Sequence, residues 1–275
     1  MDDPSPAAAA LSGHHRLTPA NLLFLLLALA GLAAFLYPFW APPHPQVPET
    51  RLVFLAFSGA AALILIGLVA EAQAGLSAHT IAMLGTLVGL NTILRVIETV
   101  FPLPGGFSPV FLLIALVGST FGGRLGFLMG ALTMLVSGPL TAGGLGPWTP
   151  YQMLAAGFVG MGSAWLPSRK GRVAWLAVYS CVWGWIYGAL TNLYFWPYAV
   201  LAPDLAWAAD LSLGETIHRY ARFYLLTSLA WDTVRAAGNL VLILILARPL
   251  LKALERFRNR AWVTWEPAAP VDGRV

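Results

Sequence analysis

The chain has 275 residues, of which 58% are hydrophobic and only 10% are charged. Soluble globular domains carry about 25% charged residues, so this composition excludes a soluble domain and predicts an all-α integral membrane protein with several spans. The net charge of +4 does not indicate nucleic-acid binding, because the basic residues fall in short segments between apolar stretches and near the C-terminus, as cytoplasmic Lys and Arg do. The single cysteine, Cys181, excludes a disulfide framework.

The N-terminal part is predicted to be a tail followed by a transmembrane hairpin. Residues 1–19 are rich in Ala, Pro and Ser and are interpreted as a cytoplasmic tail, in which His14 and His15 are solvated rather than metal ligands. Residues 20–37 and 52–70 each approach the roughly 20 apolar residues that a span needs. Their composition, mostly Leu, Ala, Phe and Ile, indicates a lipid-facing hairpin over residues 20–70.

The third predicted span, residues 79–99, has two different faces. One face carries only small residues, at spacings of four, three and four. They are Ala78, Ala82, Gly85 and Gly89. Another helix can approach this face closely. The roughly opposite face is polar and carries Asn91, Arg95 and Glu98. These polar side chains either face the bundle interior or a watery cavity, or they snorkel from the helix end to the interface.

Two closely linked helices, residues 110–121 and 125–136, are predicted next, with glycines that allow tight packing at 118, 122, 123, 126 and 130. A Gly/Pro-rich break, Gly138 to Gln152, follows them. Irregular backbone of this kind cannot face lipid, because its N–H and C=O groups would lack partners. The break contains Trp148, Tyr151 and Gln152, which have hydrogen-bonding groups. This segment is interpreted either as the lid or wall of a small-molecule site or as an interfacial turn with an aromatic anchor.

A helix over residues 151–165 then leads to the basic segment 169–172, the strongest indication of a cytoplasmic loop. The following helix, 173–193, runs outward and ends in an aromatic and polar rim that includes Asn192, Tyr194 and Trp196.

An outer connection, 199–219, is predicted with a surface helix at 205–213. A last span, 222–246, returns to a basic cytoplasmic tail, 252–275. This count gives eight spans with both termini in the cytoplasm.

The last predicted span carries polar residues near the middle of the membrane. They are Asp232, Arg235 and Asn239, next to Trp231. Asp232 can pair with Arg235 at i, i+3 or with Arg95 from the third span. The group is either a structural buried ion pair or the polar floor of a substrate cavity.

Several kinds of chemistry lack a sequence signature. No phosphate-binding loop precedes Lys170 or Lys252, the two lysines of the chain, so we expect no ATP hydrolysis by this chain. Ser137 could act as a nucleophile only with a histidine at reachable depth, and the five histidines lie in tails, links or helix ends. We therefore expect neither an enzyme nor a metal site.

Four segments resemble a known family. They are similar to the substrate-binding membrane subunit, the S component, of energy-coupling factor (ECF) transporters, particularly the cobalamin branch. The similar segments are residues 107–138, the following GGLGPWTPYQMLAAGFVGMGSAWLP, and the two stretches NLYFWPY and FYLLTSLAWDTVRAAGNLVL. The resemblance covers residues 77–251 and leaves the N-terminal hairpin outside the usual six-helix core.

The resemblance implies a subunit of the bacterial plasma membrane that captures a vitamin from outside. Cobalamin is the first candidate; riboflavin, a pterin or a queuosine precursor are alternatives, as is an intramembrane enzyme acting on a lipid or peptide. The implied partners are a transmembrane coupling subunit, which would dock on the small-residue face, and two ATPase subunits that use the ATP, with no cofactor in this chain. The implied ligand contacts are Trp148, Thr149, Tyr151, Gln152, Asn192, Tyr194, Trp196, Trp231 and Asp232, to which the polar residues Asn91, Arg95 and Arg235 are added.

Overall fold

A computed structural model describes residues 19–36, 59, 78–101, 107–141, 143–146, 148–167, 171–199, 201–208 and 210–261. The described chain is helical and contains no strand. Its α-helices are α2 (Pro19–Phe35), α4 (Ala78–Val100), α5 (Val110–Phe121), α6 (Gly123–Ser137), α7 (Trp148–Ser163), α8 (Arg172–Phe195), α9 (Leu213–Thr227) and α10 (Leu229–Ala261). Two short 3-10 helices, Gly138–Leu140 and Trp196–Tyr198, follow α6 and α8.

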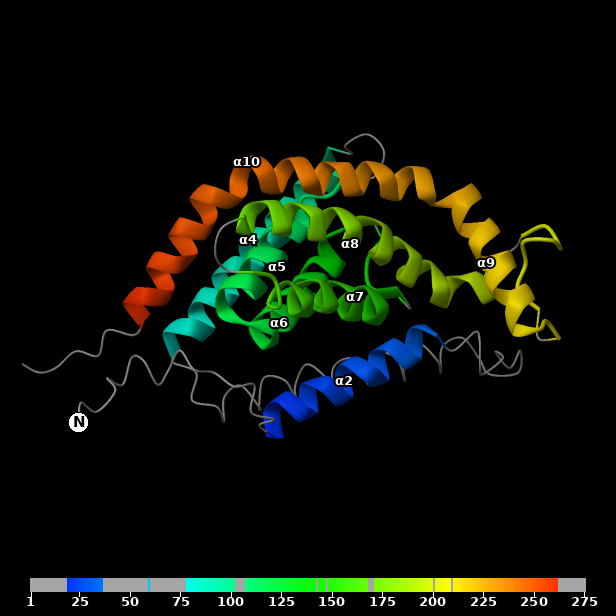
Figure 1. Ribbon diagram of the computed structural model, residues 1–275, viewed down its shortest axis with the longest axis horizontal. Helices are drawn as coiled ribbons and strands as arrows, with labels where there is room; N and C mark the ends of the chain where they lie inside the picture. The colour runs from blue at the N-terminus through cyan, green and yellow to red at the C-terminus, as the bar shows by residue number, and fades with distance from the viewer. Residues whose placement is uncertain are drawn as a thin grey trace, which may run out of the picture.

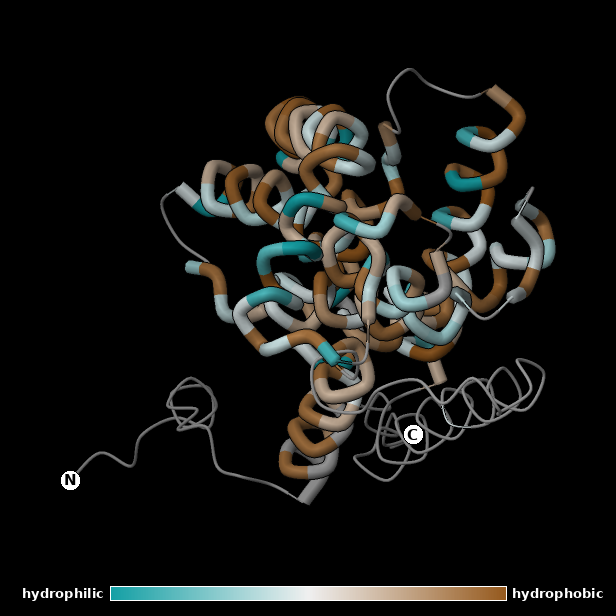
Figure 2. Tube along the Cα trace, turned by 90° about the vertical axis from the view of Figure 1, so that its right-hand side faces the viewer, coloured by the Kyte–Doolittle hydropathy of each residue, from teal (hydrophilic) through white to brown (hydrophobic). Residues whose placement is uncertain are grey.

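Four helical stretches in the described chain are long and apolar enough to cross a membrane: Ala78–Val100, Gly123–Leu140, Arg172–Phe195 and Leu229–Asn259. Two shorter apolar helices, Phe24–Phe35 and Val110–Phe121, accompany them. Figure 2 shows that most turns carry hydrophobic residues, with hydrophilic positions at a few places. The prediction of an all-α membrane protein is thus confirmed. The layout of six core helices plus a hairpin stays a prediction, and its second hairpin helix, 52–70, lies outside the described residues apart from Gly59.

The centre of the bundle is α5. Every residue from Val110 to Gly118 is buried, because α6, α7, α8 and α10 surround this short helix. In Figure 1, α10 arcs over α8 along one side of the bundle, while α2 lies on the other side, next to α6 and α7. This arrangement explains why α5 is apolar on all faces although it is too short for a span.

Glycines bring α5, α6 and α7 into backbone contact, as predicted. A Cβ added to Gly118 or Gly126 would collide with the carbonyl of Gly160, and one added to Gly130 would collide with the backbone of Ala156. Gly122 ends α5 with a φ of 98°, a conformation that favours glycine, so that α6 can fold back on α5.

We expect Gly130→Ala to destabilise the fold by about 1–3 kcal/mol, because its methyl group would meet backbone that cannot move aside. The measurement is the thermal unfolding midpoint of detergent-purified protein. Gly85→Ala is the matched control, since nothing lies within 4 Å of a Cβ at Gly85. Equal midpoints for the two variants would contradict the close approach of α6 and α7.

One face of α2 contacts the bundle, which the composition of this segment did not indicate. Phe24 and Phe35 are buried, and a Cβ at Gly31 would touch Leu154 and Phe158 of α7. The remaining described leucines of α2 are exposed and suit lipid contact.

Three predicted boundaries differ from the structure. The first is α7, which begins at Trp148 instead of residue 151 because Pro150 fits the first helical turn. The second is the predicted surface helix 205–213, which is wrong. Backbone bonds from Leu205 and Ala206 to Ala202 O form only a turn, and the carbonyls of Leu205 and Pro203 accept from the side chains of Trp196 and Arg219. A capping box of Ser212 and Glu215 instead starts α9.

The third difference concerns the last span. A break at Ser228 separates α9 from α10, so the span begins at Leu229 and not at 222. Asp232 therefore lies in the first turn of α10. At its other end, α10 continues to Ala261 through the first ten residues of the predicted basic tail.

Candidate functional site

The polar face of α4 points into the bundle. Asn91 is fully buried, and its Nδ2 donates to Val110 O at 3.1 Å and to Thr133 Oγ1 at 3.3 Å. The helical period places Arg95 and Glu98 on the same side as Asn91. Of the two alternatives for these residues, the bundle-facing one is confirmed for Asn91 and Arg95.

Arg95 joins three helices. Its Nη1 donates to Ser137 Oγ of α6 at 2.8 Å, and its Nη2 donates to Gln152 Oε1 of α7 at 3.0 Å. The Ser137 hydroxyl in turn donates to Thr133 O. Both of these acceptors are neutral, so neither of them cancels the positive charge of the guanidinium.

A second polar group comes from α8 and α10. Asp232 pairs with Arg235, which decides between the two partners considered for it. The Asp232 carboxylate lies against the backbone of α8 at Gly188. A Cβ at Gly188 would collide with this carboxylate. The Arg235 guanidinium carbon lies 5.6 Å from the ring centroid of Tyr187, a cation–π distance.

The two polar groups converge on α8. The positive charges of both Arg95 and Arg235 act on the Glu98 carboxylate, whose Oε2 also accepts a hydrogen bond from Ser108 at 2.8 Å. The charges of Arg95, Glu98 and the α10 ion pair all act on the buried phenol of Tyr187. We call Asn91, Arg95, Glu98, Tyr187, Asp232 and Arg235 the polar cluster.

An aromatic pair lies at the edge of the polar cluster. Tyr151 of α7, one residue before the Arg95 partner Gln152, stacks on Tyr194 of α8 with ring centroids 4.4 Å apart and an interplanar angle of 9°. Phe35 of α2 meets Tyr151 edge to face at 5.3 Å. These rings provide flat apolar surface beside charged and hydrogen-bonding groups, which is the composition of a site for a planar polar ligand.

The Gly-rich loop before α7 is fixed by the residues that follow it. A Cβ at Gly146 would collide with the Trp148 ring, so the indole packs directly on the loop backbone. Thr149 is buried, and its Oγ1 accepts a hydrogen bond from Gly146 N at 3.0 Å. Thr149 thus has a structural role here, whereas Trp148 is partly exposed.

Three further predicted contacts lie away from the polar cluster. Asn192 Nδ2 donates to Ser228 Oγ at 2.8 Å and so links α8 to the break between α9 and α10. Trp196 is fully buried and binds the backbone of the 201–208 connection. Trp231 is 58% exposed although its neighbour Asp232 is buried, because successive residues of α10 are turned by about 100° around the helix axis.

The small-residue face of α4 is open. All four of its residues are exposed, and a Cβ at Gly85 or Gly89 would have no atom of the described residues within 4 Å. We call Ala78, Ala82, Gly85 and Gly89 the small-residue stripe. It lies on the side of α4 opposite the buried Asn91, as the sequence spacing predicts.

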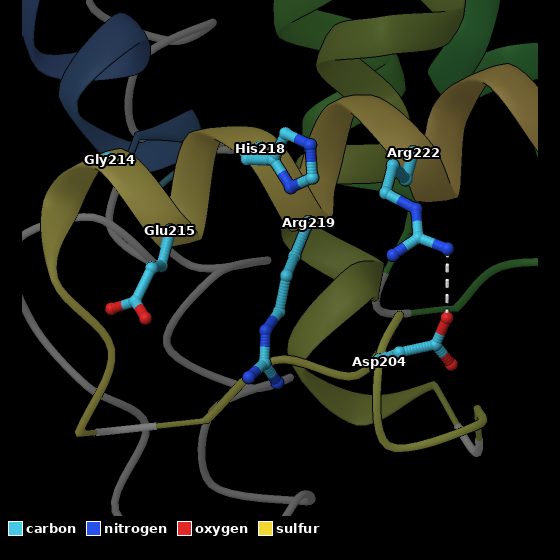
Figure 3. A pocket seen from close by; sticks show the side chains of 6 residues that line it. All are labelled: Asp204, Gly214, Glu215, His218, Arg219 and Arg222. Carbon is cyan, nitrogen blue, oxygen red and sulfur yellow. Dashed lines mark hydrogen bonds and ion pairs between the residues drawn. The ribbon is translucent and has the colours of Figure 1, made fainter.

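An open pocket of about 360 Å³ lies at the start of α9 and was not predicted. Figure 3 shows its lining: Asp204, Gly214, Glu215, His218, Arg219 and Arg222. Arg222 pairs with Asp204 at 3.0 Å, and hydrogen bonds from Ser212 lower the pKa of the Glu215 carboxyl. The ion pair of Arg222 with Asp204 ties the 201–208 connection to α9, so the pocket is a charged surface feature held by its own ion pair.

Sequence reasoning missed several residues of the site. Thr133 and Ser137 are four residues apart and present both hydroxyls on one face of α6, a spacing that could have marked a polar stripe. Gly184 and Gly188 have the same spacing, and both pack against α10. Phe35 carries no sequence signal, because its position depends on how α2 packs.

No group of three His, Cys, Asp or Glu side chains that could hold a metal ion occurs among the described residues. Comparison of the chain with protein-family models, with characterised proteins and with solved structures finds no match. The resemblance to S components therefore stays a prediction from the motifs quoted above.

Proposed function

We propose that this chain is the substrate-binding subunit of an ECF-type importer in the bacterial plasma membrane, with both termini in the cytoplasm. In this proposal α4 to α8 and α10 form the six-helix core, and α2 belongs to an additional N-terminal hairpin. The chain captures a vitamin and docks on a separate coupling subunit, and two ATPase subunits supply the energy.

The observation that carries the proposal is the division of α4 into two faces. Its inner face supplies Asn91 and Arg95 to a buried polar cluster, while no side chain in the described part of the chain covers Gly85 or Gly89 of the small-residue stripe on its outer face. A helix that only faced lipid would need neither feature. A subunit that binds a ligand on one side and another helix on the other side needs both.

The ligand that suits the site is a planar heterocycle with hydrogen-bonding or anionic groups. Tyr151 and Tyr194 supply flat surface, Arg95 and Arg235 supply positive charge, and Gln152 supplies an amide. Cobalamin is our first candidate because of the resemblance. Riboflavin, a pterin and a queuosine precursor present the same kind of planar polar ring.

The arrangement of Ser137 gives no support to an intramembrane hydrolase. Its hydroxyl proton is donated to Thr133 O, and its oxygen accepts from Arg95, a cation that cannot serve as a general base. A nucleophilic serine needs the opposite arrangement, with a base accepting its proton.

The proposal is tested by reconstituting the chain with an ECF coupling subunit and two ATPase subunits in vesicles. We expect ATP-dependent accumulation of a vitamin that requires this chain. Accumulation that is equal with and without the chain, for every vitamin tested, would refute the assignment.

Within the site, we expect Trp148→Ala to weaken vitamin binding by about two- to tenfold, because an aromatic contact contributes roughly 0.5–1.5 kcal/mol. Trp231→Ala is the matched control and should leave the Kd unchanged, since this indole is 58% exposed on the surface of α10. Both Kd values are measured by titration of detergent-purified protein. A larger effect from Trp231 than from Trp148 would contradict the placement of the site.

A further inference from the structure

The C-terminal part of α10 carries a row of basic residues at spacings of four. Arg248, Lys252 and Arg256 are all exposed. Successive residues of an α-helix are turned by about 100°, so positions four apart fall within one narrow strip of its surface. We call these three residues the basic stripe. None of them forms an ion pair with any other described residue.

The opposite side of the same segment is fixed to the bundle. Leu251 and Leu254 are buried, Glu255 pairs with Arg172 of α8, and Arg258 Nη1 donates to Thr120 O of α5 at 2.9 Å. Phe257 stacks on His79 at the start of α4, with ring centroids 4.4 Å apart. Because these contacts prevent rotation of the helix, the basic stripe is held facing outward.

The basic stripe continues an apolar face. Val234, Val241 and Ile245 lie on the same side of α10 as Arg248, and they are 39%, 50% and 65% exposed. In a membrane these side chains contact acyl chains. The face changes from apolar to basic at Arg248, about 19 residues after α10 begins at Leu229, close to the roughly 20 residues that span the hydrocarbon core. The first basic residue therefore reaches the depth of the lipid headgroups.

The helix also changes direction near this point. Pro249 lies inside α10 and removes one backbone hydrogen bond, which permits a bend. In Figure 1 the orange-to-red end of α10 bends over the end of the bundle where α4 begins. The bent segment thus runs obliquely across the bundle end, so that all three basic residues stay near the membrane surface instead of extending into water.

We propose that the basic stripe is a binding site for the phosphate groups of anionic phospholipids in the adjoining leaflet. The bundle occupies one side of the C-terminal segment of α10, and the other side is continuous with the lipid-facing surface. The phosphate groups of neighbouring lipids are therefore the negative charges that lie next to the basic stripe. This inference does not depend on the proposed transport function.

The test measures how phosphatidylglycerol, an anionic lipid, and phosphatidylcholine, a zwitterionic lipid of the same chains, bind to the purified full chain. Native mass spectrometry counts the bound lipids, and the thermal midpoint reports their effect. A basic residue near anionic lipid contributes about fivefold in affinity. The triple variant R248Q/K252Q/R256Q should therefore lose roughly 100-fold in phosphatidylglycerol affinity and keep its phosphatidylcholine binding.

Two controls separate charge from structure. R248K/R256K keeps the charge and should bind phosphatidylglycerol as the unchanged chain does, and Arg222→Gln removes a basic residue near the pocket of α9 and should have no effect. Soluble glycerol phosphate should not stabilise the chain at the concentrations at which phosphatidylglycerol does. Raising the salt concentration should reduce phosphatidylglycerol binding by the unchanged chain, which gives a readout that needs no variant.

Retention of phosphatidylglycerol by the triple variant at the level of the unchanged chain would overturn the proposal. So would binding that is insensitive to salt. If the triple variant keeps its lipids but no longer binds an ECF coupling subunit, the basic stripe contacts an acidic protein surface instead, and the lipid assignment is wrong.

Discussion

Arg95→Met is expected to weaken vitamin binding by roughly 100-fold or more. The guanidinium is held by its hydrogen bonds to Ser137 Oγ and Gln152 Oε1, and its remaining N–H groups can donate two charge-assisted hydrogen bonds to a vitamin, each contributing about 1.5–3 kcal/mol. Its loss also removes the positive charge that α4 brings to the polar cluster. Titration of the purified variant with the vitamin measures the change in Kd.

Two further variants distinguish binding from folding. Arg95→Lys keeps the charge but not the forked geometry, and it should give an intermediate Kd. Arg172→Met removes another arginine that joins helices, since Arg172 binds Ser119, Thr120 and Glu255 at the far end of the bundle. It should lower the thermal midpoint and leave the Kd unchanged. If Arg95→Met also lowers only the midpoint, Arg95 is a structural residue and the polar cluster is not the binding site.

Gly85→Leu should abolish uptake while leaving the vitamin Kd unchanged. Within this chain the new side chain meets open space, so folding and binding have no reason to change. A coupling helix approaching the small-residue stripe, however, would be held away by the leucine side chain. Uptake is measured in vesicles that contain the coupling and ATPase subunits, and the Kd on the variant alone.

Leu90→Phe is the matched control for Gly85→Leu. It also enlarges an exposed position of α4, but one turned by about 140° from Gly85 around the helix axis. Normal uptake by Gly85→Leu, or equal losses in both variants, would show that the small-residue stripe is not the docking surface.

The two faces of α4 were predictable because they depend only on the helical period. Once residues 79–99 are recognised as a helix, the four-three-four spacing puts the small residues on one side and Asn91 and Arg95 on the other. The close approach of α5, α6 and α7 was predictable for a similar reason, since clustered glycines in an apolar helix remove the side chains that keep backbones apart.

The composition of the polar cluster was only partly predictable. Sequence spacing allowed Asp232 to pair with Arg235 or with Arg95, and only the packing of α8 against α10 through Gly188 decides between them. Tyr187 carried no sequence signal, because its role depends on charges that α4 and α10 bring to it. Trp196 and Trp231 were placed in the site by resemblance, but one is buried in a structural contact and the other projects outward.

The central claim, that the chain is a vitamin-capturing membrane subunit, is tested most directly by equilibrium binding. The purified chain is titrated, without any partner, with cobalamin, riboflavin, a pterin and a queuosine precursor. We predict that one of them binds with a submicromolar Kd and that Arg95→Met removes this binding. Failure of all four to bind the folded chain would contradict the account.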